Sequence, residues 1–135
     1  MKDYIHKVQY YETDKMAIVH HSNYIRWFEE ARVHWLEQIG CTMESIEAEG
    51  VGIPVMSVTC NYHSMVRFGD NVAVKVKIGK FNGIKIEIEY EITDVKTGEL
   101  RTTGSSTHCF IDSEGKLISL KKSKPEIYEK MVAGV

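Results

Sequence analysis

The residues best suited to chemistry lie close together near the start of the chain. Asp14 precedes two adjacent histidines, His20 and His21, and a helical pattern begins just after them. The first turn of a helix carries free backbone N–H groups and the positive end of the helix dipole. A carbonyl group between these amides and the Asp14 carboxylate would meet donors on one side and a nucleophile or base on the other. This arrangement suits acyl transfer.

Each of these residues also has a simpler interpretation. Asp14 taken alone is a loop aspartate that forms a turn hydrogen bond. His20 and His21 could bind a metal ion together with Asp14. Adjacent side chains point in different directions, however, and no further ligand is evident, so we expect no metal site. Acid–base chemistry by a histidine side chain stays open, because histidine titrates near neutral pH.

A long amphipathic helix must position these groups. From Tyr24 to Ile39, apolar residues recur at steps of three and four, while the opposite face is charged. We expect Ser22 and Asn23 to accept hydrogen bonds from the first amides, and Gly40 to end the helix in a left-handed conformation. Tyr24 lies on the apolar stripe, so it belongs to the core and could also line a substrate site.

The remaining sequence predicts mainly strands, with the clearest alternation of apolar and polar residues from Ile84 to Ile92. Turn sequences with glycine separate these segments, and short turns imply antiparallel neighbours. The expected elements beside the long helix are strands over Tyr4–Tyr11, Val55–His63, Val72–Ile78, Ile84–Ile92 and Leu100–Ile111, a loop over Glu12–His20, a helical turn over Met43–Ala48 and a helix over Pro125–Met131.

These elements predict an α+β fold with a five-stranded antiparallel sheet that has one apolar and one wet face. Only the long helix can cover the apolar face. Its expected length of roughly 24 Å matches the width of five strands. The sheet should therefore wrap around a long central helix. Such a sheet leaves an edge that must be paired or covered, so we expect a homodimer or homotetramer.

Composition limits the class of protein. The 135 residues fit one domain over 1–135, and 43% hydrophobic and 27% charged residues are ordinary for a globular protein. A net charge of −2 gives no electrostatic reason to expect nucleic acid. No apolar run could span a membrane and no signal peptide is evident, so we expect a cytoplasmic protein. Cys41, Cys60 and Cys109 form no CxxC pair and predict reduced thiols.

The block around Asp14 is the most specific motif of the sequence. It consists of YETD (11–14), VHHSNY (19–24) and WFEEAR (27–32), and later blocks are RFGD (67–70), EYEI (89–92), TGEL (97–100) and LKK (120–122). Together these blocks resemble the 4-hydroxybenzoyl-CoA thioesterase-like hotdog family, in particular its small bacterial acyl-CoA thioesterases. The resemblance implies a hotdog fold and hydrolysis of an acyl-CoA to free acid and thiol. It implies no cofactor, since coenzyme A is part of the substrate.

The resemblance also implies roles for single residues. Asp14 matches the family's catalytic aspartate, which attacks the thioester carbonyl or activates the water that does. His21 matches the position whose backbone N–H polarises that carbonyl. The sequence departs from the family at Ala17, where glycine is common. If this position requires a positive φ, alanine would strain the loop and could move Asp14.

Several further residues are candidates for binding the substrate. Arg67, Lys121 and Lys122 are suited to the phosphates of coenzyme A, although a lysine-rich segment is more often simply solvated. The remaining candidates lie beside the helix or at the end of a strand: His20, Tyr24 and His63.

Two other functions fit the same fold. A hydroxyacyl dehydratase would use a histidine and a carboxylate on the long helix, for which Glu29 is a candidate. A non-catalytic acyl-CoA-binding module would bind its ligand without turnover. Substitution of Asp14 should inactivate a thioesterase, whereas substitution of Glu29 should inactivate a dehydratase. The absence of turnover would indicate the binding module.

Overall fold

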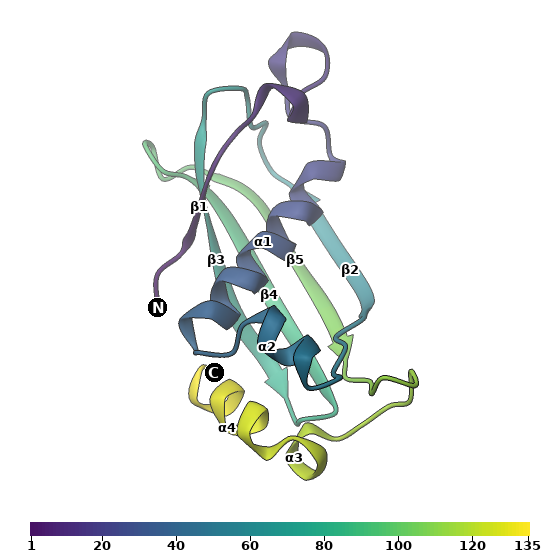
Figure 1. Ribbon diagram of the computed structural model, residues 1–135. Coiled ribbons are helices and arrows are strands. Elements are labelled where there is room, and N and C mark those ends of the chain that lie inside the picture. Colours follow the sequence, from purple (N-terminus) through teal and green to yellow (C-terminus); the bar gives the residue numbers. More distant parts are fainter.

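The computed structural model describes residues 1–135 and places one long helix against the concave face of a five-stranded antiparallel sheet (Figure 1). The predicted hotdog fold is confirmed. The strands are β1 (Tyr4–Lys7), β2 (Val55–Tyr62), β3 (Asn71–Phe81), β4 (Lys85–Asp94) and β5 (Leu100–Cys109); the helices are α1 (Ser22–Gln38), α2 (Met43–Ala48), α3 (Leu120–Ser123) and α4 (Pro125–Ala133); two 3-10 turns are η1 (Tyr10–Glu12) and η2 (Lys15–Ala17).

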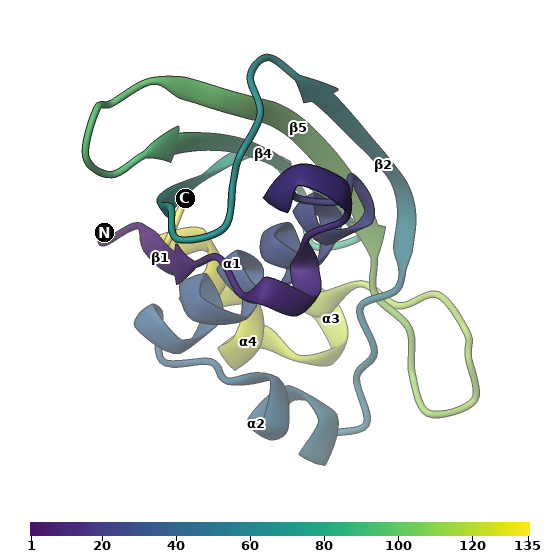
Figure 2. The same ribbon diagram turned by 90° about the horizontal axis from the view of Figure 1, so that it is seen from above.

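The strand order is β1-β3-β4-β5-β2, and every neighbouring pair is antiparallel. The consecutive strands β3, β4 and β5 form hairpins, as their turn sequences predict. Strand β2 lies beside β5 and not beside β3, because residues 63–70 carry the chain across the end of the sheet (Figure 2). Strand β2 therefore forms an edge of the sheet with a partner on one side only.

The apolar stripe of α1 fills the concave face of the sheet. Trp27 and Phe28 are fully buried, and the Phe28 ring stacks on Tyr90 of β4 with 4.3 Å between ring centroids. Opposite Phe28, strand β5 carries Gly104, where an added Cβ would come within 2.6 Å of the Phe28 ring. Burial of each large side chain contributes about 1.5–3 kcal/mol, so these contacts fix α1 firmly on the sheet.

The ends of several elements, and the capping of α1, differ from the sequence prediction. Strand β1 ends at Lys7 and not at Tyr11, because the chain tightens into η1. The predicted capping by Ser22 and Asn23 is wrong. The Ser22 N–H instead donates to Nδ1 of His20 at 3.2 Å, and the Asn23 side chain is itself a donor. The prediction for Gly40 is confirmed, since it follows α1 with a φ of +78°.

Candidate functional site

The loop between β1 and α1 folds back on itself. Thr13 and Val19 form an isolated antiparallel bridge, and the Asp14 N–H donates to the Ile18 carbonyl at 2.8 Å. Ile18 also bridges to Arg67, which ties the loop to the connection between β2 and β3. The bridge returns the chain toward α1 and leaves the Asp14 side chain exposed. Its carboxylate is therefore open to a ligand.

Two residues after Asp14, the backbone enters a strained conformation. Met16 and Ala17 have φ values of +66° and +59°, and neither is glycine. Position 17, where the family commonly has glycine, thus adopts a positive φ with alanine in place. The left-handed conformation costs a residue with a Cβ about 1–2 kcal/mol. The Ala17 carbonyl accepts a hydrogen bond from the Phe68 N–H at 2.9 Å, and this contact helps to hold the strained turn.

The start of α1 offers one unpaired backbone donor. The Ser22 N–H is bonded to the His20 ring, and the Asn23 N–H donates to the His20 carbonyl at 3.0 Å. The His21 N–H has no acceptor within the chain. It lies at the positive end of a helix of 17 residues, where a partly negative oxygen is stabilised. The Tyr62 hydroxyl donates to the His21 carbonyl at 3.3 Å and links this point to the end of β2.

The buried carboxylate of Glu12 anchors the loop through three hydrogen bonds. Glu12 is 5% exposed; its Oε1 accepts from the Gln9 N–H at 2.7 Å and pairs with Nε2 of His6 at 2.8 Å. Its Oε2 accepts from the Trp27 indole N–H at 2.6 Å. Burial by itself raises the pKa of Glu12, but these three hydrogen bonds outweigh it and hold the pKa below its ordinary value. Glu12 is therefore ionised at neutral pH.

Sequence reasoning did not single out Glu12 or its partner His6. Nδ1 of His6 lies 3.1 Å from the Tyr4 hydroxyl and 3.3 Å from the Glu30 carboxylate, so the network extends from η1 to β1 and α1. Burial and the nearby Glu30 carboxylate raise the pKa of Tyr4, which keeps its proton. One signal was present in the sequence: Trp27 lies on the apolar stripe of the helix, and its buried N–H requires an acceptor.

The other candidates at this end of the molecule differ in their exposure to solvent. The exposed rings of His20 and His21 lie 4.2 Å apart, and the structure contains no group of three or more His, Cys, Asp or Glu residues placed to hold a metal ion. Tyr24 is buried between the rings of Trp27 and Tyr62, each with its centroid 5.0 Å away. Tyr24 therefore supports the site from the core.

Three predicted substrate-binding residues are not brought to Asp14 within one chain. His63 pairs with Thr103 at 3.0 Å on the outer face of the sheet, which points away from α1. Lys121 and Lys122 are exposed on α3, at the opposite end of the molecule from the Asp14 loop (Figure 1). Arg67, by contrast, is bridged to the loop itself.

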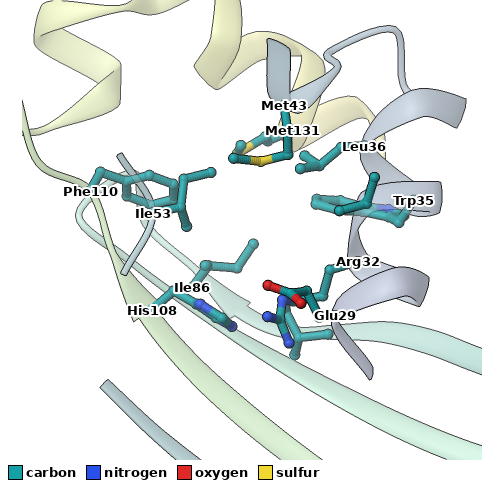
Figure 3. Close-up of a pocket in the computed structure, with 12 residues that line it drawn as sticks. Glu29, Arg32, Trp35, Leu36, Met43, Ile53, Ile86, His108, Phe110 and Met131 are labelled. Carbon is teal, nitrogen blue, oxygen red and sulfur yellow. The ribbon is translucent and has the colours of Figure 1, made fainter. Parts of the chain in front are cut away.

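A separate cavity of about 110 Å³ lies beside the C-terminal half of α1 (Figure 3). Its walls are mostly apolar and come from α1, α2, α4, the sheet and the segment before β2. Polar side chains gather at one corner. Glu29, the carboxylate considered for a dehydratase, lines this cavity, whereas Asp14, His21 and the predicted substrate-binding residues do not. The lining residues are Glu29, Arg32, Val33, Trp35, Leu36, Met43, Ile53, Ile86, Ile88, His108, Phe110 and Met131.

The polar corner of this cavity continues as a chain of hydrogen bonds into the sheet. Arg32 donates to the Tyr90 hydroxyl at 3.2 Å, the hydroxyls of Tyr90 and Ser106 are 2.6 Å apart, and Ser106 Oγ lies 2.7 Å from Nε2 of His108. Burial, assisted by the Arg32 charge, lowers the pKa of His108 to about 4. His108 is therefore neutral at pH 7.

The model of a family described as the thioesterase-like superfamily matches residues 8–133. The chain is 34% identical over 128 residues to a putative acyl-CoA thioesterase, YneP, of Bacillus subtilis, with 92% of both chains covered. It is also similar to the solved DHNA-CoA thioesterase from Staphylococcus aureus, with 32% identity, a TM-score of 0.92 and coverage of 98% and 89%. The hypothetical protein TT1821 from Thermus thermophilus gives 27% identity and a TM-score of 0.91, with both chains fully covered.

Proposed function

The chain belongs to the thioesterase-like superfamily, and we propose that it is an enzyme that hydrolyses an acyl-CoA to a free carboxylic acid and coenzyme A. Two features of the loop before α1 support the proposal: the Asp14 carboxylate is exposed, and the His21 N–H at the start of α1 has no acceptor within the chain. The names of the relatives support the substrate class, because both YneP and the Staphylococcus aureus enzyme are described as thioesterases of CoA esters.

In the proposed mechanism Asp14 acts in one of two ways. As a general base, it takes a proton from the water that attacks the thioester carbonyl. As a nucleophile, it forms a mixed anhydride that water then cleaves. In both routes negative charge develops on the carbonyl oxygen, where the His21 N–H and the α1 dipole stabilise it. The C–S bond then breaks, and the thiolate of coenzyme A takes up a proton. One such amide donor contributes about a hundred- to a thousandfold in rate.

We propose that the working form is at least a homodimer joined along β2. This strand has a partner on one side only and exposes Val55, Met56 and Val58. An unpaired edge of this kind is a ready site for pairing with a second copy. Antiparallel pairing would place the Tyr62 end of β2, which contacts His21, beside the Val55 end of the second copy.

In such a dimer the phosphates of coenzyme A would bind Arg67 of one copy together with Lys121 and Lys122 of the other. The helices are too short or too polar to span a bilayer. Sedimentation equilibrium at micromolar concentration tests the dimer. A single species at the chain mass of 15.5 kDa would contradict it.

Thiol release from a panel of acyl-CoAs, from acetyl to palmitoyl and aromatic, tests the proposed reaction. We expect Asp14→Asn to lower kcat by about a hundredfold or more, because the amide neither attacks nor accepts a proton. Asp3→Asn, at another exposed aspartate, is the matched control and should retain full turnover. A dehydratase would release no thiol. It would instead eliminate water from a 3-hydroxyacyl-CoA to give an enoyl-CoA, a reaction that Glu29→Gln should abolish and Asp14→Asn should retain. Binding of acyl-CoA without any turnover would indicate the binding module.

A further inference from the structure

We propose that Glu12 is a positioning residue for this site, whose buried carboxylate holds the Asp14 loop against the start of α1. The inference rests on the proposed function, because it assigns Glu12 to the geometry in which Asp14 works. Glu12 does not touch the substrate in this proposal. It acts only through the loop.

Glu12 is bonded to both ends of the loop. Its carboxylate accepts the Gln9 N–H, where the loop begins. Its carbonyl accepts the His20 N–H at 2.9 Å and the Asn23 side-chain amide at 2.8 Å, where the loop ends and α1 begins. Asp14 lies two residues further along the chain. A shift of Glu12 would therefore move the Asp14 carboxylate relative to the His21 amide.

The carboxylate also joins the loop to α1 and to β1. Trp27, its partner on α1, is fully buried. His6, its partner on β1, pairs in register with Val72 of β3. The loop is thus fixed to the helix on one side and to the sheet on the other, although its strained turn at Met16 and Ala17 favours a different path.

A neutral amide cannot replace this carboxylate. An ionised carboxylate only accepts hydrogen bonds, and three donors converge on Glu12. In Glu12→Gln, one orientation of the amide turns its NH₂ toward the Trp27 indole N–H. The flipped orientation turns it toward the Gln9 backbone N–H. Either way two donors face each other in a buried place, which forces the loop to move.

The first experiment compares kcat and KM for thiol release by the wild type and Glu12→Gln. We expect kcat to fall about tenfold or more, with KM within about twofold, because the substrate contacts remain while the reacting groups are displaced. Ile46→Val removes one methylene from the fully buried core of α2 and is the control for lost stability. It should keep the wild-type kcat. A wild-type kcat in Glu12→Gln, or an equal loss in Ile46→Val, would overturn the proposal.

A second variant tests the cause of the defect. Trp27→Phe keeps an aromatic ring but removes the N–H, so Glu12→Gln/Trp27→Phe no longer places two donors together at this position. The double variant should recover part of the kcat lost in Glu12→Gln. If the kcat loss in the double variant equals the product of the fold losses in Glu12→Gln and Trp27→Phe, the contact between carboxylate and indole does not position the loop.

Amide hydrogen exchange gives a readout that does not depend on turnover. In Glu12→Gln, the N–H groups of Asp14 and His20 should exchange faster than in the wild type, while those of α4 stay unchanged. Unchanged exchange in the loop would overturn the anchoring by Glu12. A wild type that releases no thiol, yet shows faster loop exchange on substitution, would refute the proposed function and leave the anchor supported.

Discussion

Mild acid should destabilise the protein through His108. This side chain is 1% exposed, and burial beside Arg32 lowers its pKa to about 4. In the unfolded chain it titrates at the ordinary value, about 6.5. As the pH falls through this range, the unfolded state takes up a proton that the folded state does not. The stability from His108 is therefore complete above the unfolded pKa, lost progressively toward pH 4, and not reduced further below it.

The size of the effect follows from the two pKa values. A gap of about 2.5 pKa units corresponds to a maximal loss of about 3 kcal/mol, at 1.36 kcal/mol per unit. At about pH 5, the same linkage gives a loss of about 2 kcal/mol relative to pH 7.5. This is a large part of the stability of an ordinary domain.

Urea unfolding at a series of pH values measures this loss. His108→Gln keeps a hydrogen-bonding group near Ser106 but does not titrate. The other five of the six histidines are present in both proteins, so their contributions cancel in the comparison. The free energy of unfolding of the wild type should fall by about 2 kcal/mol more than that of the variant between pH 7.5 and 5. Parallel pH profiles would refute the buried, neutral state of His108.

Three further substitutions test the positive φ of Ala17, the close packing at Gly104 and the ion pair of Asp94. Ala17→Gly should raise the free energy of unfolding by up to about 1 kcal/mol in urea, because glycine relieves the φ of +59°, whereas Ala133→Gly at the end of α4 should lower it. Gly104→Ala should lower the free energy of unfolding by about 2 kcal/mol or more, because the new Cβ would lie 2.5 Å from the Thr59 carbonyl oxygen. Gly79→Ala is the control and should change stability much less, since its closest contact would be at 3.5 Å. Equal effects of the two substitutions would contradict the close packing at Gly104. The Thr97 N–H and Arg101 lower the pKa of Asp94, so its contribution to stability is present above its ordinary pKa and is lost as the pH falls through the lowered pKa. Asp94→Asn should therefore melt at a lower temperature than the wild type at pH 7, and the difference should shrink as the pH falls below the ordinary pKa of aspartate. A difference that does not change with pH would contradict this role.

Local patterns in the sequence are enough to predict most of the helices and strands. The three- and four-residue spacing around Trp27 and Phe28 specifies α1, and the alternation from Ile84 to Ile92 specifies β4, because these patterns arise from local backbone geometry. Glycine at position 40 marked the end of α1 for the same local reason. The short distance along the chain from Asp14 to His21 is the basis of the prediction that the two act on one carbonyl group, and the substitution of Asp14 tests it.

Which distant residues meet depends on how α1 packs on the sheet. Local spacing carries no information on the placement of β2 beside β5, on the three donors that converge on Glu12, or on the chain of contacts from Arg32 to His108. These contacts form because α1 must bury its apolar stripe against the sheet, which brings polar groups from distant segments into a space without water. Each buried polar group there needs a hydrogen-bond partner. The same packing separates Lys121 and Lys122 from Asp14, although all three lie in motifs of one family.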